Sequence, residues 1–180
     1  MRDFAAFLRG INVGGHRVKG PQLCEVFDEL GCREVSMFRA SGNVVFDADR
    51  EPEAELAARI EAGLEAALGY EAITFLRSAR EVATIAATEP FEPAALERSK
   101  GKLQVVMLAS KPAAKARKLV LARGTEDDRV DFGERELYWL PAGDTQDSQL
   151  DWKAIAGVLG PSTMRTKGTV EQMAVKHFSD

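Results

Sequence analysis

A glycine-rich stretch near the N-terminus carries the residues best suited to bind a ligand. Three glycines, Gly10, Gly14 and Gly15, lie within six residues, and backbone N–H groups in such loops can approach an anion closely. Potentially cationic side chains flank these glycines, with no acidic residue between the first and the last of them: Arg9, His16, Arg17 and Lys19. The stretch therefore predicts binding of a phosphate or another small anion, although its spacing matches neither common nucleotide-binding fingerprint.

Each polar residue of this stretch also has an ordinary structural alternative, and the sequence leaves both open. Arg9 can clamp an anion through a planar bidentate contact or pair with one of the many acidic side chains. Asn12 can hold a ligand through its amide or cap its own turn. Lys19 can reach a phosphate as a point charge or remain an exposed lysine. The whole stretch can equally be a solvated turn that carries surface charge.

Ser41 opens a second polar turn, Ser41-Gly42-Asn43. A nucleophilic serine needs a base and an orienting partner, and the surrounding residues lack the G-x-S-x-G pattern of the hydrolase elbow. We therefore expect Ser41 to form a turn or ligand hydrogen bond rather than to act as a nucleophile. His177 lies on an apolar helical stripe and is expected to be packed or to cap its helix.

Hydrophobic periodicity and turn residues predict the elements that position these loops. A buried strand over residues 4–8 leads into the glycine-rich stretch, and Pro21 suits the first turn of a helix. Ser78 with Glu81 three residues later predicts a capping box that opens a short helix. The expected elements before that box are strands at 4–8, 35–39, 44–46 and 73–76, a helix at 21–30 and a helix at 56–68. This order is typical of the split βαβ, or ferredoxin-like, arrangement.

The topology brings the two polar loops to one edge of the predicted sheet. The first and second strands run parallel, so the loop 10–20 and the turn 41–43 both leave the sheet at that edge. The first helix begins there too, with the positive end of its dipole. The residues expected to bind the ligand in this half are Arg9, Gly10, Asn12, Gly14, Gly15, Lys19, Ser41 and Asn43.

The order of elements then repeats after residues 88–102, which are punctuated by Pro and Gly and predict a linker. A further strand, helix, hairpin, helix and short strand are expected over residues 103–165, followed by a helix with Thr169 as a possible N-cap. We thus predict an α+β protein with antiparallel sheets in two ferredoxin-like halves, 1–87 and 103–180, the second of which ends with the C-terminal helix. No repeat of individual residues accompanies the topological one.

Several of these motifs together resemble a known bacterial family. Leu8 to Gly15 followed by Lys19, and then Ser41 to Phe46, are similar to the family catalogued as domain of unknown function 1697. The C-terminal segment that resembles the family contains Leu159-Gly160, Met164-Arg165 and Thr169-Val170. The family usually has an Arg-Asn pair followed by an aromatic residue where this chain has Arg165-Thr166-Lys167-Gly168. The resemblance implies an α+β fold of ferredoxin-like halves and no established activity.

Arg165 extends the predicted binding set into this second basic stretch. If the two halves pack face to face, the segment from Met164 to Thr169 can close over the loop 10–20. A single sequence does not fix that packing.

Composition narrows the classes of partner and location. Apolar residues make up 45% and charged residues 29% of the chain, which is typical of a soluble globular protein. Its formal net charge of −4 argues against non-specific binding of nucleic acid by the whole surface. The N-terminus does not resemble a signal peptide, and no apolar run is long enough to cross a membrane. We therefore expect a cytoplasmic protein with reduced Cys24 and Cys32.

The sequence predicts a small anionic or nucleotide-like ligand and does not identify a reaction. Two cysteines and two histidines make a structural zinc site unexpected, and no cofactor is indicated. The competing hypothesis is a nucleic-acid or protein interaction module that uses the same basic edge. A deep pocket with converging N–H groups would favour the small ligand, whereas a long basic stripe with exposed aromatic residues would favour nucleic acid. The oligomeric state is not predicted.

Overall fold

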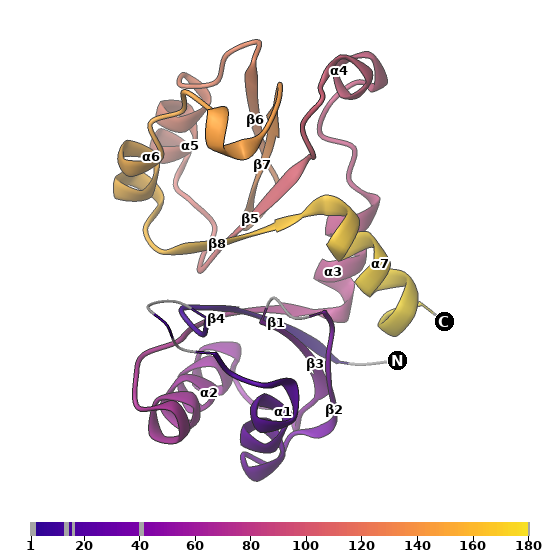
Figure 1. The fold of residues 1–180 in the computed structure, drawn as a ribbon, viewed down its shortest axis with the longest axis vertical. Helices are drawn as coiled ribbons and strands as arrows, with labels where there is room; N and C mark the ends of the chain where they lie inside the picture. The colour runs from indigo at the N-terminus through magenta and orange to yellow at the C-terminus, as the bar shows by residue number, and fades with distance from the viewer. Residues whose placement is uncertain (1–2, 13–14, 16, 40–41, 180) are drawn as a thin grey trace. The chain divides into compact units, whose positions relative to one another are not determined.

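The computed structural model describes residues 3–12, 15, 17–39 and 42–179 and divides into two units. Unit 1 comprises Met1–Ala83 with Met173–Asp180, and unit 2 comprises Thr84–Gln172. Each unit contains a four-stranded antiparallel sheet. The predicted α+β class with antiparallel sheets is therefore confirmed (Figure 1).

The sheet of unit 1 has the strand order β2-β3-β1-β4. Its elements in chain order are β1 Phe4–Arg9, α1 Gly20–Glu29, β2 Arg33–Met37, β3 Asn43–Asp47, α2 Glu53–Leu68 and β4 Ile73–Ser78. The predicted central position of the first strand is confirmed, since Ala6 lies opposite Val44 on one side and Leu76 on the other. This strand order is compatible with a ferredoxin-like half.

Apolar spacing explains why α1 and α2 pack on one face of the sheet (Figure 1). Leu56, Ile60 and Leu64 recur at helical spacing on α2 and are fully buried. They form one core cluster with alternate residues of the strands, among them Ala6 and Phe46. The period of 3.6 residues in the helices and of two in the strands thus places all these side chains in the same layer.

Unit 2 repeats the arrangement with the strand order β6-β7-β5-β8. The strands of this sheet and the helices between them are, in chain order, β5 Gln104–Leu108, α5 Ala114–Leu121, β6 Asp128–Phe132, β7 Glu136–Pro141, a 3-10 turn Thr145–Asp147, α6 Trp152–Leu159 and β8 Ser162–Thr166. Val106, Leu137 and Trp139 form its core with Val120 of α5 and Ile155 of α6. The helices α5 and α6 lie on the same face of the sheet in Figure 1.

The segment predicted as a linker, residues 88–102, contains the helix α4, Pro93–Arg98. Its C-terminal end is bonded to the end of β7, because the Lys100 N–H donates to the carbonyl of Ala142 over 2.8 Å. Prolines are typical of linkers, but Pro93 occupies the first turn of this helix, where its missing N–H is harmless.

One further helix continues directly from the last strand of each sheet: one helix follows β4, and the other follows β8. The capping box predicted at Ser78 is confirmed at the start of α3, Ala79–Ala87, since Ser78 and Glu81 bond each other reciprocally. The helix α7, Lys167–His177, begins two residues before the predicted cap. Thr166 rather than Thr169 caps it, because the Thr169 N–H donates to Thr166 Oγ1 over 3.3 Å.

The two units share a residue pattern that the sequence did not reveal. Arg77 pairs with Ala5, the second residue of β1, and Arg165 pairs with Val105, the second residue of β5. Each arginine therefore has the same register in its sheet and is followed by a hydroxyl residue that caps the next helix. The correspondence was hidden because the rest of the two strands differs in residue type.

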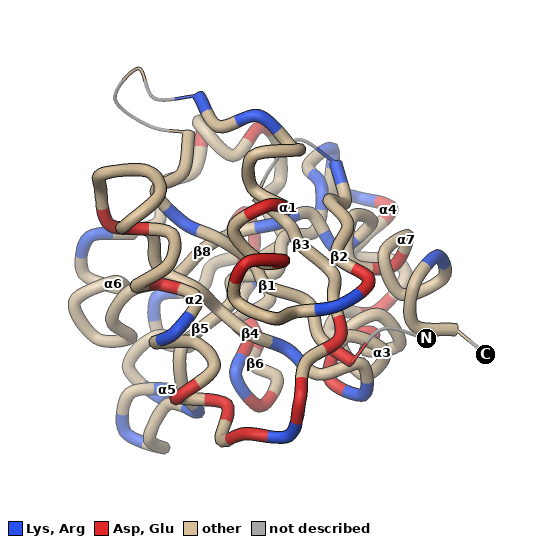
Figure 2. The backbone as a smooth tube through the Cα atoms, turned by 90° about the horizontal axis from the view of Figure 1, so that it is seen from below, with Lys and Arg blue, Asp and Glu red and all other residues tan. Residues whose placement is uncertain are grey.

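Charged residues of both signs are distributed along the chain (Figure 2). None of the helices in the described ranges is long and apolar enough to cross a bilayer.

Candidate functional site

The loop that follows β1 and the turn that precedes β3 are in direct contact. The Leu8 N–H donates to the carbonyl of Gly42 over 2.8 Å. A Cβ atom on Gly42 would lie only 2.7 Å from Ile11 Cδ1, and the φ of Gly42 is +71°. The expected convergence of these two loops therefore occurs, and glycine is required at position 42 for both backbone conformation and space.

The start of α1 lies at the same edge of the sheet. Lys19 occupies the N-cap, where its carbonyl accepts from the Leu23 N–H over 3.1 Å and no side chain caps the helix. A Cβ atom on Gly20 would lie 3.8 Å from Met37 Sδ at the end of β2. The positive end of the α1 dipole thus adjoins the ends of two strands, as the topology predicts.

Two hydrogen bonds hold the loop after β1 in place. The Asn12 side chain accepts from the Val18 N–H over 3.1 Å, which is the turn-capping alternative expected for this residue. The Tyr70 hydroxyl donates to the carbonyl of Ile11 over 2.9 Å. Sequence reasoning missed Tyr70, whose only local signal is its position directly after Gly69 at the end of α2.

Three exposed cations surround this loop: Arg9, Arg17 and Lys19. Within the part of the chain that the structure describes, none of the three forms an ion pair with an acidic side chain. The ion-pair alternative for Arg9 is therefore not observed among these residues.

The described glycines of the loop have the backbone conformation that glycine favours. Gly10 has a φ of +93° and Gly15 a φ of +87°, values that other residues adopt only with strain. A Cβ atom on Gly10 would also lie 3.1 Å from the carbonyl oxygen of Glu71. Gly14, His16 and Ser41 lie outside the described residues, so their predicted roles remain predictions.

Asn43 is placed differently from the exposed members of the predicted set. It is fully buried, and its Nδ2 donates to the carbonyl of Phe38 over 3.1 Å. Its amide thereby closes the hairpin between β2 and β3, so we assign it a role in positioning the turn. A polar residue in a turn gives no sequence signal that separates a buried amide from an exposed one.

Arg39 is a further cation at this edge that sequence reasoning did not select. It is exposed, follows the end of β2 and has a φ of +61°, which is uncommon for a residue with a side chain. Its guanidinium carbon lies 5.9 Å from the centre of the Phe38 ring. Its position between a strand and a glycine turn is the signal that would have identified it.

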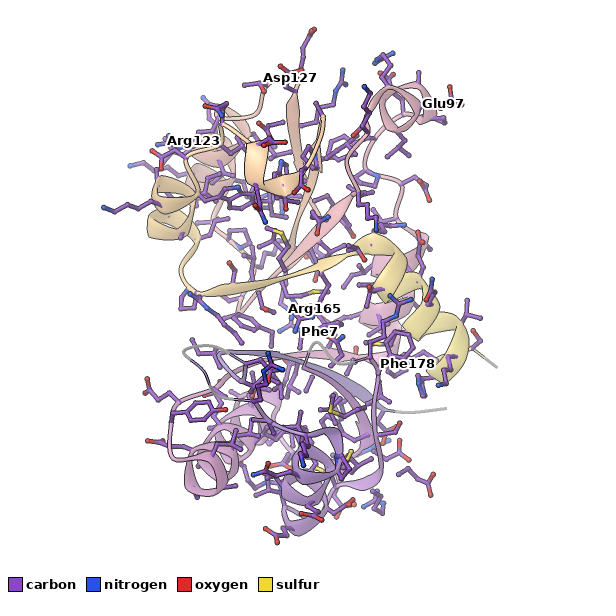
Figure 3. The ribbon with its side chains drawn as sticks, viewed as in Figure 1. Phe7, Glu97, Arg123, Asp127, Arg165 and Phe178 are labelled. Atoms are coloured by element: carbon purple, nitrogen blue, oxygen red, sulfur yellow. The ribbon has the colours of Figure 1, made fainter. Side chains whose placement is uncertain are left out.

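Arg165 belongs to β8 of unit 2 and is labelled in Figure 3. Its guanidinium donates to Thr163 Oγ1 over 2.8 Å and to the carbonyl of Met164 over 2.7 Å. Burial lowers the pKa of this guanidinium to about 10, because loss of water disfavours the charged form. Its predicted role in ligand binding stays a prediction.

The described part of the site offers guanidinium, ammonium and backbone N–H groups, all of which bind anions. Among the described residues, no group of three or more histidine, cysteine, aspartate or glutamate side chains could hold a metal ion. The two thiols, Cys24 and Cys32, lie on or beside α1, and burial is the main cause that raises the pKa of each. The described residues at this edge therefore supply positively charged groups and hydrogen-bond donors.

Comparisons with known proteins agree with the fold. A family model described as protein of unknown function (DUF1697) matches residues 1–138. A solved structure, that of the conserved bacterial protein SP0830 from Streptococcus pneumoniae, is 20% identical with a TM-score of 0.71. That similarity covers 98% of this chain and 99% of the other. A comparison with curated proteins gave no match.

Proposed function

The chain belongs to the DUF1697 family of proteins of unknown function, and we propose, from its own residues, that it binds a small anionic or nucleotide-like ligand. The proposed site is the edge of unit 1 formed by the loop 10–20 and the turn 41–43. The observation that carries the proposal is the group of exposed cations, Arg9, Arg17 and Lys19, around a glycine loop and a helix start.

Electrostatics supports an anion at this edge. Like charges near one another raise the free energy of the unliganded protein, and an anion between them lowers it. The first N–H groups of α1 have no side-chain cap and add a positive partial charge. A phosphate or carboxylate would meet both kinds of donor without displacing an existing ion pair of these three cations among the described residues.

The proposal assigns different roles to the residues of the predicted set. Arg9 and Lys19 contact the ligand by charge, and the backbone of Gly10, Gly14 and Gly15 approaches it closely. Asn12 and Asn43 hold the two loops in position. Ser41 contributes a hydrogen bond from the turn. We also propose that each unit is a ferredoxin-like half and that the protein works in the cytoplasm.

The test is a thermal-shift screen of phosphorylated metabolites and nucleotides, followed by calorimetric titration of the best compound. A ligand at about 100 times its dissociation constant adds roughly 2.7 kcal/mol to the free energy of unfolding. Arg9→Ala should weaken binding by about 1.5–3 kcal/mol, the value of a charge-assisted hydrogen bond. Arg50→Ala is the matched control, because Arg50 is an exposed arginine of unit 1 outside the site.

Equal affinity in wild type and Arg9→Ala would reject the anion site. An affinity that falls steeply and linearly with the logarithm of salt concentration, and that grows with oligonucleotide length, would instead support the nucleic-acid interaction module.

A further inference from the structure

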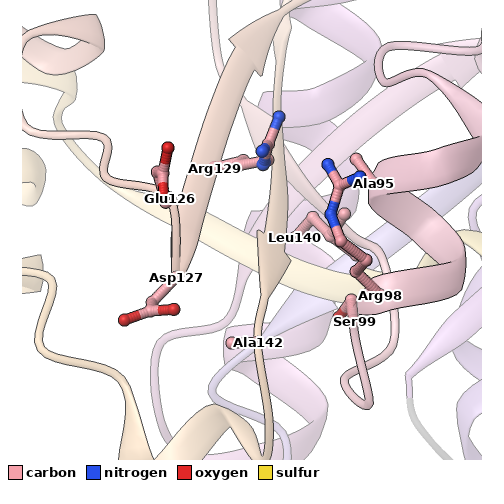
Figure 4. A pocket seen from close by; sticks show the side chains of 8 residues that line it. All are labelled: Ala95, Arg98, Ser99, Glu126, Asp127, Arg129, Leu140 and Ala142. Atoms are coloured by element: carbon pink, nitrogen blue, oxygen red, sulfur yellow. The ribbon is translucent and has the colours of Figure 1, made fainter.

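Unit 2 contains a pocket of about 210 Å³ that none of the predicted site residues lines. Helix α4 forms one wall of it, and the start of β6 and the end of β7 form the others (Figure 4). Its most distinctive feature is a pair of arginines, Arg98 from α4 and Arg129 from β6, whose guanidinium groups are turned toward each other in Figure 4.

Among the residues that the structure describes, the two guanidinium groups share a single, loosely placed acidic partner. Glu92 Oε1 lies 3.7 Å from the Arg98 guanidinium and 3.9 Å from that of Arg129, and both distances exceed that of a hydrogen bond. All three side chains reach solvent, with Arg129 the least exposed at 32%. An anion bonded directly to both arginines would therefore replace a weak contact with two charge-assisted hydrogen bonds.

Backbone contacts fix the walls of the pocket before any ligand arrives. The Lys100 N–H donates to the carbonyl of Ala142, and the Ser99 hydroxyl donates to the carbonyl of Pro141. On the opposite wall, the Ala142 N–H donates to the carbonyl of Asp127 over 2.6 Å. A preformed site of this kind loses little conformational freedom when it binds.

The remaining lining residues restrict the kind of ligand. Leu140 and Ala95 are buried apolar residues of the lining, whereas Glu126 and Asp127 are exposed acids on the side away from Arg98 (Figure 4). Those acids would repel a polyanion such as a nucleic acid. The volume of about 210 Å³ is below the range of about 300–1,000 Å³ that is typical of sites for drug-sized ligands, so only a small molecule, or a small part of a larger one, fits inside.

We propose that this pocket binds a small molecule that joins one carboxylate or phosphate group to a compact apolar body. The anionic group bonds Arg98 and Arg129 and displaces Glu92, and the apolar body lies against Leu140 and Ala95. The site is separate from the edge of unit 1 and does not depend on the function proposed there.

The test uses amide chemical-shift titrations of the full chain with phenyl phosphate, benzoate and benzyl alcohol. The first two probes distinguish phosphate from carboxylate, and the third is the neutral control. We expect saturable shifts at Ala95 and Ala142 with at least one anionic probe in the low millimolar range. Arg98→Ala and Arg129→Ala should each weaken binding about tenfold or more, and Glu92→Gln should strengthen it.

Two control variants test whether binding needs the arginines of this pocket or any exposed arginine of the chain. Arg123→Ala removes an exposed arginine of unit 2 outside the pocket, and Arg9→Ala removes the key cation of unit 1. Both should bind the probe like wild type. The proposal is overturned if neither anionic probe gives saturable shifts, if benzyl alcohol binds equally well, or if the Arg98 and Arg129 variants keep wild-type affinity.

Discussion

At the residue scale, burial separates side chains that can meet a ligand from those that hold the fold. Arg9 and Asn43 lie at the same edge of unit 1, but Arg9 is exposed and the Asn43 amide is buried against the chain. Removing the charge of Arg9 should therefore affect binding with little effect on stability. Asn43 is expected to behave in the opposite way, because its replacement leaves the buried Phe38 carbonyl without this donor, which is costly.

Cys24 provides a prediction of chemical reactivity. Burial is the main cause that raises the pKa of its thiol, and the nearby Asp28 carboxylate adds to the increase. Because only the thiolate reacts, alkylation of Cys24 should become fast at a higher pH in the native protein than in the unfolded chain. At pH 7 iodoacetamide should modify Cys24 several-fold more slowly in buffer than in denaturant, as measured by peptide mass spectrometry. Equal rates in the two conditions would contradict this assignment.

At the element scale, the contact between the two loops depends on one position, Gly42. Its positive φ and its close approach to Ile11 are separate constraints, and a substitution meets both. Gly69, at the end of α2, has a similar φ of +79° but open space around a Cβ atom. The two glycines thus form a matched pair that separates backbone strain from crowding.

We expect Gly69→Ala to lower the free energy of unfolding by about 1–2 kcal/mol, the cost of a left-handed conformation. Gly42→Ala should cost roughly 1–3 kcal/mol more, because its methyl group crowds the buried Ile11. Urea unfolding measures both values. In an Ile11→Val background, which removes Cδ1, the extra cost of Gly42→Ala should shrink; an unchanged cost would show that crowding is not its source.

At the scale of the whole molecule, the units do not follow the order of the chain. The last residues, Met173–Asp180, belong to unit 1 although they follow the whole of unit 2. The His177 ring lies edge-to-face with Phe38, at a centroid distance of 5.7 Å. The division expected from the sequence, with one half ending before residue 88 and the other running to 180, does not include this return of the chain.

Substitutions at Phe178 and Val175 test the assignment of the last residues to unit 1. Phe178 is buried, whereas Val175 is 75% exposed. Phe178→Ala should lower the free energy of unfolding by about 3–5 kcal/mol, and Val175→Ala should leave it nearly unchanged. In hydrogen exchange, Phe178→Ala should reduce the protection of the backbone amides in β2 and β3 and leave that of the amides in β6 and β7 unchanged. Faster exchange confined to β6 and β7 would contradict the assignment.

The sequence by itself determined the features that depend on local preferences. The buried run of β1, the box at Ser78 and the glycines at positive φ follow from hydrophobic period, side-chain hydrogen bonding and the absence of a Cβ atom. The order of elements then limits the topology to few choices, so the central position of β1 and the meeting of the two loops were also predictable.

Only the tertiary structure decided which polar groups are buried and which distant residues become neighbours. The placement of Asn43, the helix in residues 88–102, the common register of Arg77 and Arg165 and the pairing of Arg98 with Arg129 all depend on it. The physical reason is that local pattern sets the conformation of each segment. Burial and proximity of a side chain depend instead on how segments far apart in the chain pack together.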